Sequence, residues 1–294
     1  MGRAIEPLVA RRLAAQALTR RAPSVAAAAR QLFGIQAQDL PQAQWALASR
    51  AEGATLATVD AAFARGEIVR SWPMRGTLHV VPAEDAPWLA AFFRTRNLAR
   101  HARRLRELEI EARDVAIARD VVESVLGDAG MPREELFTHL VRAGQRVERQ
   151  RGVLLLWHLA QDGVLCLAGD RFILAARRIA SPRLLAGDEA LGELARRYRR
   201  GHGPTTVEDL AFWCGLPKGV ARRAIEIAGD TVDADGAAIP DALLLPGFDE
   251  YLLGYADRSA CIAAEDFARI VPGGNGVFLP MLVLRGQVRG TWRR

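Results

Sequence analysis

The stretch TTVEDLAFWCGLPKGVARRAIEIA, residues 205–228, has the pattern of a helix, a turn and a second helix. Thr205-Thr206 can supply the N-cap hydroxyl of a first helix over Val207–Trp213. Gly215-Leu216-Pro217 interrupts the helical periodicity, and Lys218–Ala228 resumes it. This order is the helix-turn-helix pattern, which is common in DNA-binding proteins. Three packed helices also occur in proteins that never contact DNA, so the pattern alone leaves both alternatives open.

The same arrangement, amphipathic helices followed by two short strands, recurs about three times along the chain. In this third copy we expect a small wing from Thr231–Asp235 and Ala238–Ile239. The first copy is predicted to contain helices over Ile5–Leu18, from Ser24 to Phe33, after Asp39 with Gln42 completing a capping box, and over Val59–Ala64 after Thr58, then strands Ile68–Trp72 and Thr77–Val81. The second copy is predicted to contain helices Val115–Leu126, Glu134–Ala143 and Leu154–Gln161 and strands Val164–Ala168 and Arg171–Ala175.

The chain changes character after Ala242. Strands are predicted over Leu243–Pro246, Val277–Leu284 and Val288–Trp292, with a turn at Arg285-Gly286-Gln287. The last predicted strand is unfinished at Arg294, so we expect this domain to be incomplete at its C-terminus.

These patterns predict a mainly α protein with β wings, of class α+β, in which tandem winged-helix units are followed by a C-terminal β-domain. The predicted division is unit one at 1–82, a helical linker at 83–112, unit two at 113–182, unit three at 183–241 and a β-rich domain with a hairpin at 242–294.

The charge, the hydrophobic pattern and the cysteines limit the classes of protein to which this chain can belong. The formal net charge is +6, and Lys218 is the only lysine, so arginine supplies nearly all the positive charge. Guanidinium groups suit bidentate contact with phosphate, although the same bias that enriches alanine also favours arginine over lysine. No stretch is long and apolar enough to span a membrane. The three cysteines are scattered, which argues against a metal site and fits a reducing, cytoplasmic (nucleoid-associated) location.

Three segments in this order carry a resemblance to a known family. They are Gly34-Ile35-Gln36-Ala37-Gln38, then Arg75-Gly76-Thr77-Leu78-His79, then LPGFDEYLLGYADR at residues 245–258. Together they resemble the AlkZ-like, interstrand-crosslink-repair family of winged-helix DNA glycosylases, over nearly the whole chain.

The resemblance implies tandem winged helices around a β-domain, a concave DNA-binding surface, and removal of bulky N7-alkylated purines with unhooking of interstrand crosslinks. Its catalytic motif is Gln, an apolar residue, then Gln or Asp, which here falls on Gln36 and Gln38. A C-terminal hairpin approaches DNA in the family, and we place it at Arg285 and Gln287. The implied enzyme is a monofunctional hydrolase that needs no metal and no cofactor.

Carboxamides suit such a reaction for a physical reason. A purine alkylated at N7 is cationic and leaves as a neutral base, so it needs little general-acid help. A neutral carbonyl can accept from the attacking water and face the developing oxocarbenium charge. Spacing alone equally fits surface glutamines that bond backbone groups, and Asp39 is an alternative base or a helix cap.

The first predicted hairpin offers further candidates for DNA contact. Arg75 lies at its turn, and Thr77 and His79 alternate with Leu78, so both are expected to face away from the apolar side. A surface arginine and a structural histidine are the alternatives. Trp72, Trp88 and Trp213 are expected in the core, as is Trp45, for which stacking on a base is the alternative; Asp249 is expected to pair with Arg258.

Two rival functions fit the same pattern. A transcriptional regulator would need dimer symmetry, but the sequence has no obvious dimerisation helix, so a monomer is expected. A degenerate relative could bind damaged double-stranded DNA without cutting it.

Overall fold

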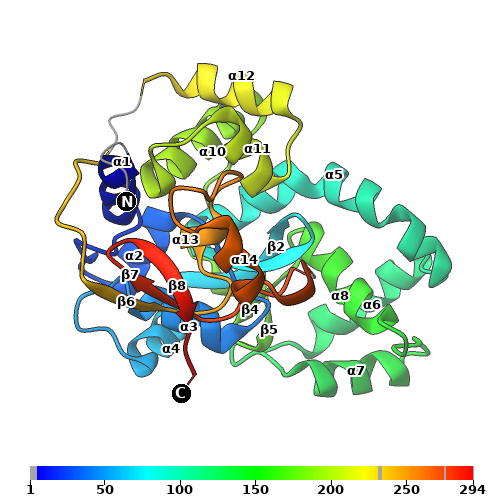
Figure 1. Cartoon of the computed structure of the whole chain (residues 1–294). Helices are drawn as coiled ribbons and strands as arrows, with labels where there is room; N and C mark the ends of the chain where they lie inside the picture. The colour runs from blue at the N-terminus through cyan, green and yellow to red at the C-terminus, as the bar shows by residue number, and fades with distance from the viewer. Residues whose placement is uncertain (1–4, 231–233, 275, 294) are drawn as a thin grey trace. The chain divides into compact units, whose positions relative to one another are not determined.

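The computed structural model describes residues 5–230, 234–274 and 276–293. The chain forms two compact units (Figure 1). Ala62–Ala186 is the inserted unit, and the flanking segments, up to Ala61 and from Gly187, make the discontinuous unit. Each unit combines helices with an antiparallel sheet, which confirms the α+β class. The five-part division of the sequence stays a prediction.

The inserted unit begins with the hairpin that the sequence predicts. Its strands pair antiparallel in the order β3-β2-β4-β5. Its elements are β2 (Ile68–Met74), β3 (Thr77–Pro82), α5 (Ala86–Glu107), α6 (Ala112–Val125), α7 (Arg133–Arg142), α8 (Arg151–Gln161), β4 (Leu165–Ala168), β5 (Arg171–Leu174) and the short α9 (Ala175–Arg178).

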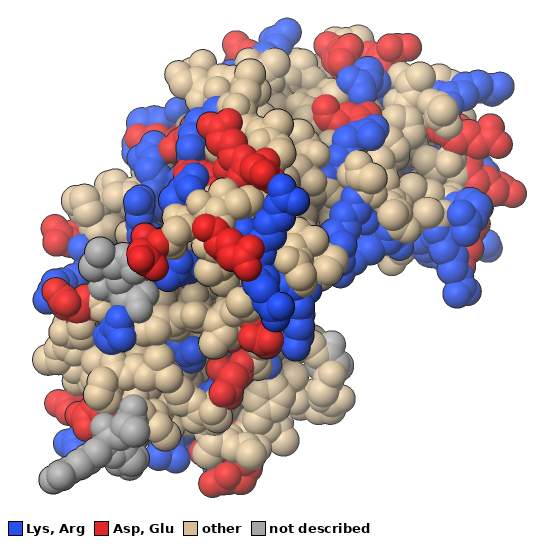
Figure 2. Space-filling view, turned by 90° about the horizontal axis from the view of Figure 1, so that it is seen from above, with Lys and Arg blue, Asp and Glu red and all other residues tan. Residues whose placement is uncertain are grey.

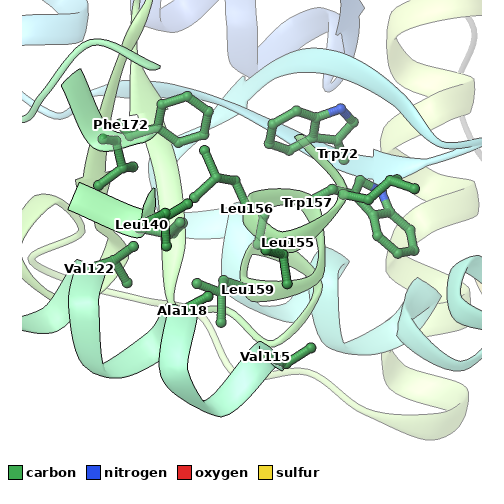
Figure 3. Packing of buried hydrophobic residues seen from close by; sticks show 14 of the residues in the cluster. Trp72, Val115, Ala118, Val122, Leu140, Leu155, Leu156, Trp157, Leu159 and Phe172 are labelled. Atoms are coloured by element: carbon green, nitrogen blue, oxygen red, sulfur yellow. The ribbon is translucent and has the colours of Figure 1, made fainter. Parts of the chain in front are cut away.

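A hydrophobic core joins this sheet to α6, α7 and α8 (Figure 3). Trp72 from β2 stacks on Phe172 from β5, with ring centroids 6.3 Å apart. Leu155 and Leu159 of α8 are completely buried, as is Val122 of α6. Burial of such side chains contributes about 1.5–3 kcal/mol of folding free energy each. This core therefore stabilises β2 and β3, the two strands of the first hairpin.

The discontinuous unit contains the helix-turn-helix segment. Its helices are α1 (Ile5–Ala15), α2 (Val25–Leu32), α3 (Leu40–Ala48), α4 (Leu56–Ala64, which runs on past Ala61), α10 (Gly187–His202), α11 (Val207–Cys214), α12 (Lys218–Ala228), α13 (Glu250–Leu253) and α14 (Ala264–Ile270). Its strands are β1 (Ile35–Gln36), β6 (Ala242–Leu245), β7 (Met281–Leu284) and β8 (Gln287–Thr291).

Local signals set the boundaries of these helices. Thr206 caps α11 and forms a capping box with Asp209, and Gly215 follows in the left-handed conformation (φ 71°). Ser24 caps α2 by accepting from Ala27 N. The predicted cap at Thr58 is wrong, because Thr55 Oγ1 accepts from Thr58 N at 3.3 Å and α4 starts one turn earlier.

The C-terminal sheet follows the order β6-β7-β8 and packs on α1 and α13 through one core, which includes Val9, Leu13, Tyr251 and Met281. The predicted wing after α12 is not formed where the structure describes it. Ala238–Ile239 has no strand, and residues 231–233 lie outside the described residues. Two short helices, α13 and α14, lie between β6 and β7, where the sequence analysis predicted no element.

Candidate active site

Gln36 and Gln38 lie in a short extended segment between two helices. α2 ends at Leu32, β1 covers Ile35–Gln36, and α3 begins at Leu40. Gln36 is half-buried and Gln38 is exposed. Gln36 Nε2 donates to Gln38 Oε1 at 3.1 Å. The two carboxamides therefore form one polar pair, which we call the glutamine pair.

Asp39, the alternative base, serves as the N-cap of α3. Its Oδ1 accepts from Gln42 N at 3.1 Å. The capping box predicted with Gln42 is wrong, because Gln42 Oε1 accepts from Gly247 N at 2.7 Å. Gln42 thus ties α3 to the LPGFDEYLLGYADR segment instead of closing its own helix.

A buried carboxylate lies directly behind the glutamine pair. Glu250 is 1% exposed and opens α13. Its Oε1 accepts from the backbone N of Gln36 at 3.3 Å. Its Oε2 accepts from Trp213 Nε1 at 2.9 Å and lies 3.3 Å from His202 Nε2. Three parts of the unit, β1, α11 and α10, therefore meet at one side chain.

Aromatic packing surrounds this carboxylate. The Tyr198 ring stacks on His202 at 4.7 Å between centroids and lies 4.9 Å from Trp213, and all three residues are fully buried. A Cβ on Gly254 would come within 2.5 Å of His202 Cδ2. Glycine at this position of the family segment therefore leaves the space that His202 occupies.

Asp249 pairs with a residue that the sequence did not single out. Arg50 donates to both Asp249 oxygens, at 2.9 and 2.7 Å, and both side chains are fully buried. Arg50 also donates to Gln16 Oε1 at 3.0 Å. Arg258, the predicted partner, lies over the Phe212 ring at 5.0 Å and donates to Leu252 O.

The first hairpin has a two-residue turn. Met74 pairs with Thr77, and Arg75 and Gly76 between them both have positive φ, 56° and 76°. That is the signature of a type I′ turn. Leu78 packs on the hydrophobic core of this unit, and Thr77 and His79, which alternate with it, are half-buried and fully buried. The imidazole lies 3.2 Å from Arg75 Nη2 and 2.9 Å from Thr77 O. Its two ring nitrogens therefore contact residues at and next to the turn.

The C-terminal hairpin repeats this geometry. Leu284 pairs with Gln287, and Arg285 and Gly286 have φ of 48° and 76°. The Arg285 side chain is 83% exposed, and its Nε lies 3.5 Å from Asp241. Gln287 Nε2 donates to Ala260 O at 2.6 Å. The Arg285 side chain is therefore exposed beside a carboxylate, whereas the Gln287 amide bonds the protein backbone.

Comparison with known proteins decides the family. Residues 29–294 match the family described as DNA glycosylase AlkZ-like. The chain belongs to the AlkZ-like DNA glycosylase family. An interstrand DNA cross-link repair glycosylase of Streptomyces sahachiroi is 28% identical over 305 residues, which cover 92% of this chain and 82% of that protein. The solved structure of Streptomyces sahachiroi DNA glycosylase AlkZ shares the fold, with a TM-score of 0.77 at 24% identity over 98% of this chain and 87% of that chain.

Family membership confirms the resemblance seen in the sequence and favours a repair glycosylase over a transcriptional regulator. Within this AlkZ-like fold, Gln36 and Gln38 contact each other, and Arg285 and Gln287 share a turn in the same unit. Arg75, Thr77 and His79 belong to the inserted unit. Their roles in catalysis and DNA contact stay predictions.

Sequence reasoning missed Glu250 and His202 and took Trp213 only as core, where it is indeed fully buried. One signal was available. Asp249-Glu250 interrupts an otherwise apolar segment, and carboxylates inside a core require donors. Trp72 and Trp88 are buried as predicted, whereas Trp45 is 37% exposed and donates to Leu244 O.

Basic side chains of the AlkZ-like chain are interspersed with acidic ones over the face drawn in Figure 2. Several arginines of α5 are paired with carboxylates. Arg103 and Arg104 contact Glu107, and Arg94 contacts Asp162 at 2.7 Å. The exposed pairs with Glu107 add at most about 1 kcal/mol of stability each, whereas Asp162 is largely buried.

Among the described residues, no group of three or more His, Cys, Asp or Glu side chains has the geometry to hold a metal ion. The free cysteines Cys166, Cys214 and Cys261 are all buried. No helix in the described part of the chain is long and apolar enough to cross a membrane.

Proposed function

We propose that this chain hydrolyses the N-glycosidic bond of bulky N7-alkylated purines in duplex DNA, with Gln36 and Gln38 positioning the attacking water. The observation that supports it most is the bond between the two carboxamides, because it holds both amide planes in one orientation. A preorganised carbonyl dipole can accept from water and face a developing positive charge without reorganising.

The reaction balances without an acid catalyst. The C1′–N9 bond breaks, and its electron pair neutralises the cationic alkylpurine, which leaves. A C1′–O bond forms to the water, whose released proton passes to solvent. Neither step requires a group that changes its protonation state, so carboxamides are sufficient for lesions that are already cationic and are poorly suited to ordinary bases.

We also propose that the enzyme is monofunctional and independent of metal. Bifunctional glycosylases use an amine to form a Schiff base at C1′. Lys218 is the only lysine in the sequence, and its side chain is 69% exposed beside Glu208 at 3.5 Å. Its ammonium group is thus exposed and paired with a carboxylate, not enclosed in a pocket of the kind that holds Schiff-base lysines. The monomeric state and the nucleoid location stay predictions.

Unhooking of interstrand crosslinks follows from the same chemistry. A crosslink that joins two purines through their N7 atoms makes each of them a cationic leaving group. The relative from Streptomyces sahachiroi is named as an interstrand DNA cross-link repair glycosylase. We propose that this chain releases one strand of such a crosslink, which a denaturing gel of a crosslinked duplex would detect.

Single-turnover excision of N7-methylguanine, read by alkaline strand cleavage, tests the assignment. Gln36→Ala and Gln38→Ala should each lower the rate by about 10²–10³ with DNA affinity and melting temperature preserved. Gln44→Ala is the matched control, because Gln44 is also half-buried in this unit but bonds Asp60. Its rate should equal the parent's.

Gln38→Asp converts the motif to the family's other form and should stay active, since it supplies an anionic acceptor. If both alanine variants excise at the parent rate, the glutamine assignment is wrong, and Asp39→Asn tests the next candidate. If the parent binds methylated DNA but releases no base, the chain is a non-catalytic damage-binding protein.

A further inference from the structure

We infer that Glu250 is a positioning residue, whose buried carboxylate holds the backbone of Gln36 and thereby fixes the glutamine pair. The inference rests on the proposed function of Gln36 and Gln38. It assigns a role in the reaction to a side chain that lies behind the site and contacts the main chain of the catalytic segment at Gln36.

The carboxylate itself is held in place from three directions. The Gln36 N–H and the Trp213 indole N–H both donate to it, and His202 Nε2 lies against the same oxygen as the indole. His202 Nδ1 meanwhile faces Tyr198 O at 3.2 Å. Both ring nitrogens of His202 therefore lie against oxygen acceptors, and Nε2 is the one that meets the Glu250 carboxylate.

Only a carboxylate satisfies this arrangement. An ionised carboxyl group is purely an acceptor with about four lone-pair directions, and it meets three N–H groups here. A carboxamide of the same shape would turn an NH₂ group toward at least one donor. Glu250→Gln therefore leaves volume and packing nearly unchanged while it breaks the acceptor set.

The catalytic segment depends on this support because it has little structure of its own. β1 is two residues long and lies between the end of α2 and the N-cap of α3. The Gln36–Gln38 bond joins two residues of that same segment, so it moves with the backbone. A displacement of about 1 Å at a catalytic group can lower a rate about 10²-fold.

The test measures single-turnover excision at saturating enzyme, together with the DNA dissociation constant and thermal melting. Glu250→Gln should excise about 10–100 times more slowly than the parent with an unchanged dissociation constant. Asp85→Asn is the matched control. Asp85 is also a fully buried carboxylate that accepts from an indole, that of Trp88, and from a cation, Arg183, but it belongs to the inserted unit. It should lose stability and keep the parent rate.

A combined variant separates positioning from general damage to the fold. If Glu250 acts through the glutamine pair, Glu250→Gln adds no further loss in a background that carries both Gln36→Ala and Gln38→Ala. An equal fall in both backgrounds, or a parent rate in Glu250→Gln, overturns the inference. Should Glu250→Gln fail to fold, Trp213→Phe is the substitute variant, because it removes one donor to the carboxylate and keeps an aromatic ring. It should slow excision several-fold, and a parent rate would again contradict the inference.

The same variants distinguish this inference from the proposed function. A slow Gln36→Ala with a normal Glu250→Gln refutes only the positioning role. A normal Gln36→Ala refutes the glutamine assignment itself.

Discussion

The turn at Arg75 combines a predicted DNA contact with an unusual backbone. Arg75 has φ of 56°, and Gly76 follows at 76°. A residue other than glycine in this region costs about 1 kcal/mol or more, and asparagine tolerates it best. Arg75→Asn therefore removes the cation and installs the Asn-Gly pair that type I′ turns prefer.

Two effects on stability nearly cancel in this variant. Relief of the backbone is worth about 1 kcal/mol, and loss of the 3.2 Å contact with buried His79 costs about 1 kcal/mol. We expect the melting temperature to stay within about 4 °C of the parent. DNA binding should nevertheless weaken, because one phosphate contact is lost. The plot of log K against log salt concentration should also become less steep, by about 0.9.

Fluorescence anisotropy with undamaged duplex DNA over a salt series measures both the affinity and this slope. Arg133→Asn is the control for charge alone, since Arg133 is an exposed arginine of the same unit that contacts Glu134. An Arg75→Asn slope equal to that of the parent would show that the first hairpin does not touch phosphate.

Two further predictions concern metal and the buried ion pair. Excision should be unchanged after dialysis against a chelator, because departure of a cationic base needs no Lewis acid; activity that is lost and then restored by zinc or magnesium would contradict this. Asp249→Ala leaves Arg50 buried without its carboxylate and should lower the free energy of unfolding in urea by about 3–5 kcal/mol. Glu134→Ala, which removes an exposed partner, should cost less than about 1 kcal/mol, and equal losses would refute the argument.

Features set by neighbouring residues were predictable from the sequence. Ser24, Asp39 and Thr206 cap the helices that follow them, since a cap involves groups only three residues apart. The two Arg-Gly turns also follow from local patterns of alternating apolar residues around a glycine. The assignment of Gln36 and Gln38 as the candidate catalytic residues came from the family resemblance. The structure adds the hydrogen bond between their side chains.

Features set by distant residues were not predictable. The Glu250–Gln36 bond spans 214 positions and the Arg50–Asp249 pair spans 199, so no local pattern encodes either. Gln42 shows how tertiary contacts override local ones, because its side chain bonds Gly247 rather than its own helix start. The four-residue helix α13 is too short for periodicity to reveal.

That short helix contacts both the glutamine segment and the C-terminal hairpin. Its first residue, Glu250, holds the backbone of the glutamine pair, and the next, Tyr251, donates its hydroxyl to Gly286 O at 2.6 Å in the turn that carries Arg285. Burial raises the pKa of the Tyr251 hydroxyl, so it keeps the proton that this bond requires. Asp249 caps the helix and is itself held by Arg50. Adjacent residues of one buried helix therefore hold both the glutamine segment, predicted to be catalytic, and the C-terminal hairpin, predicted to contact DNA. A shift of α13 would move both, so the proposed excision would depend on the placement of this helix as well as on the glutamine pair.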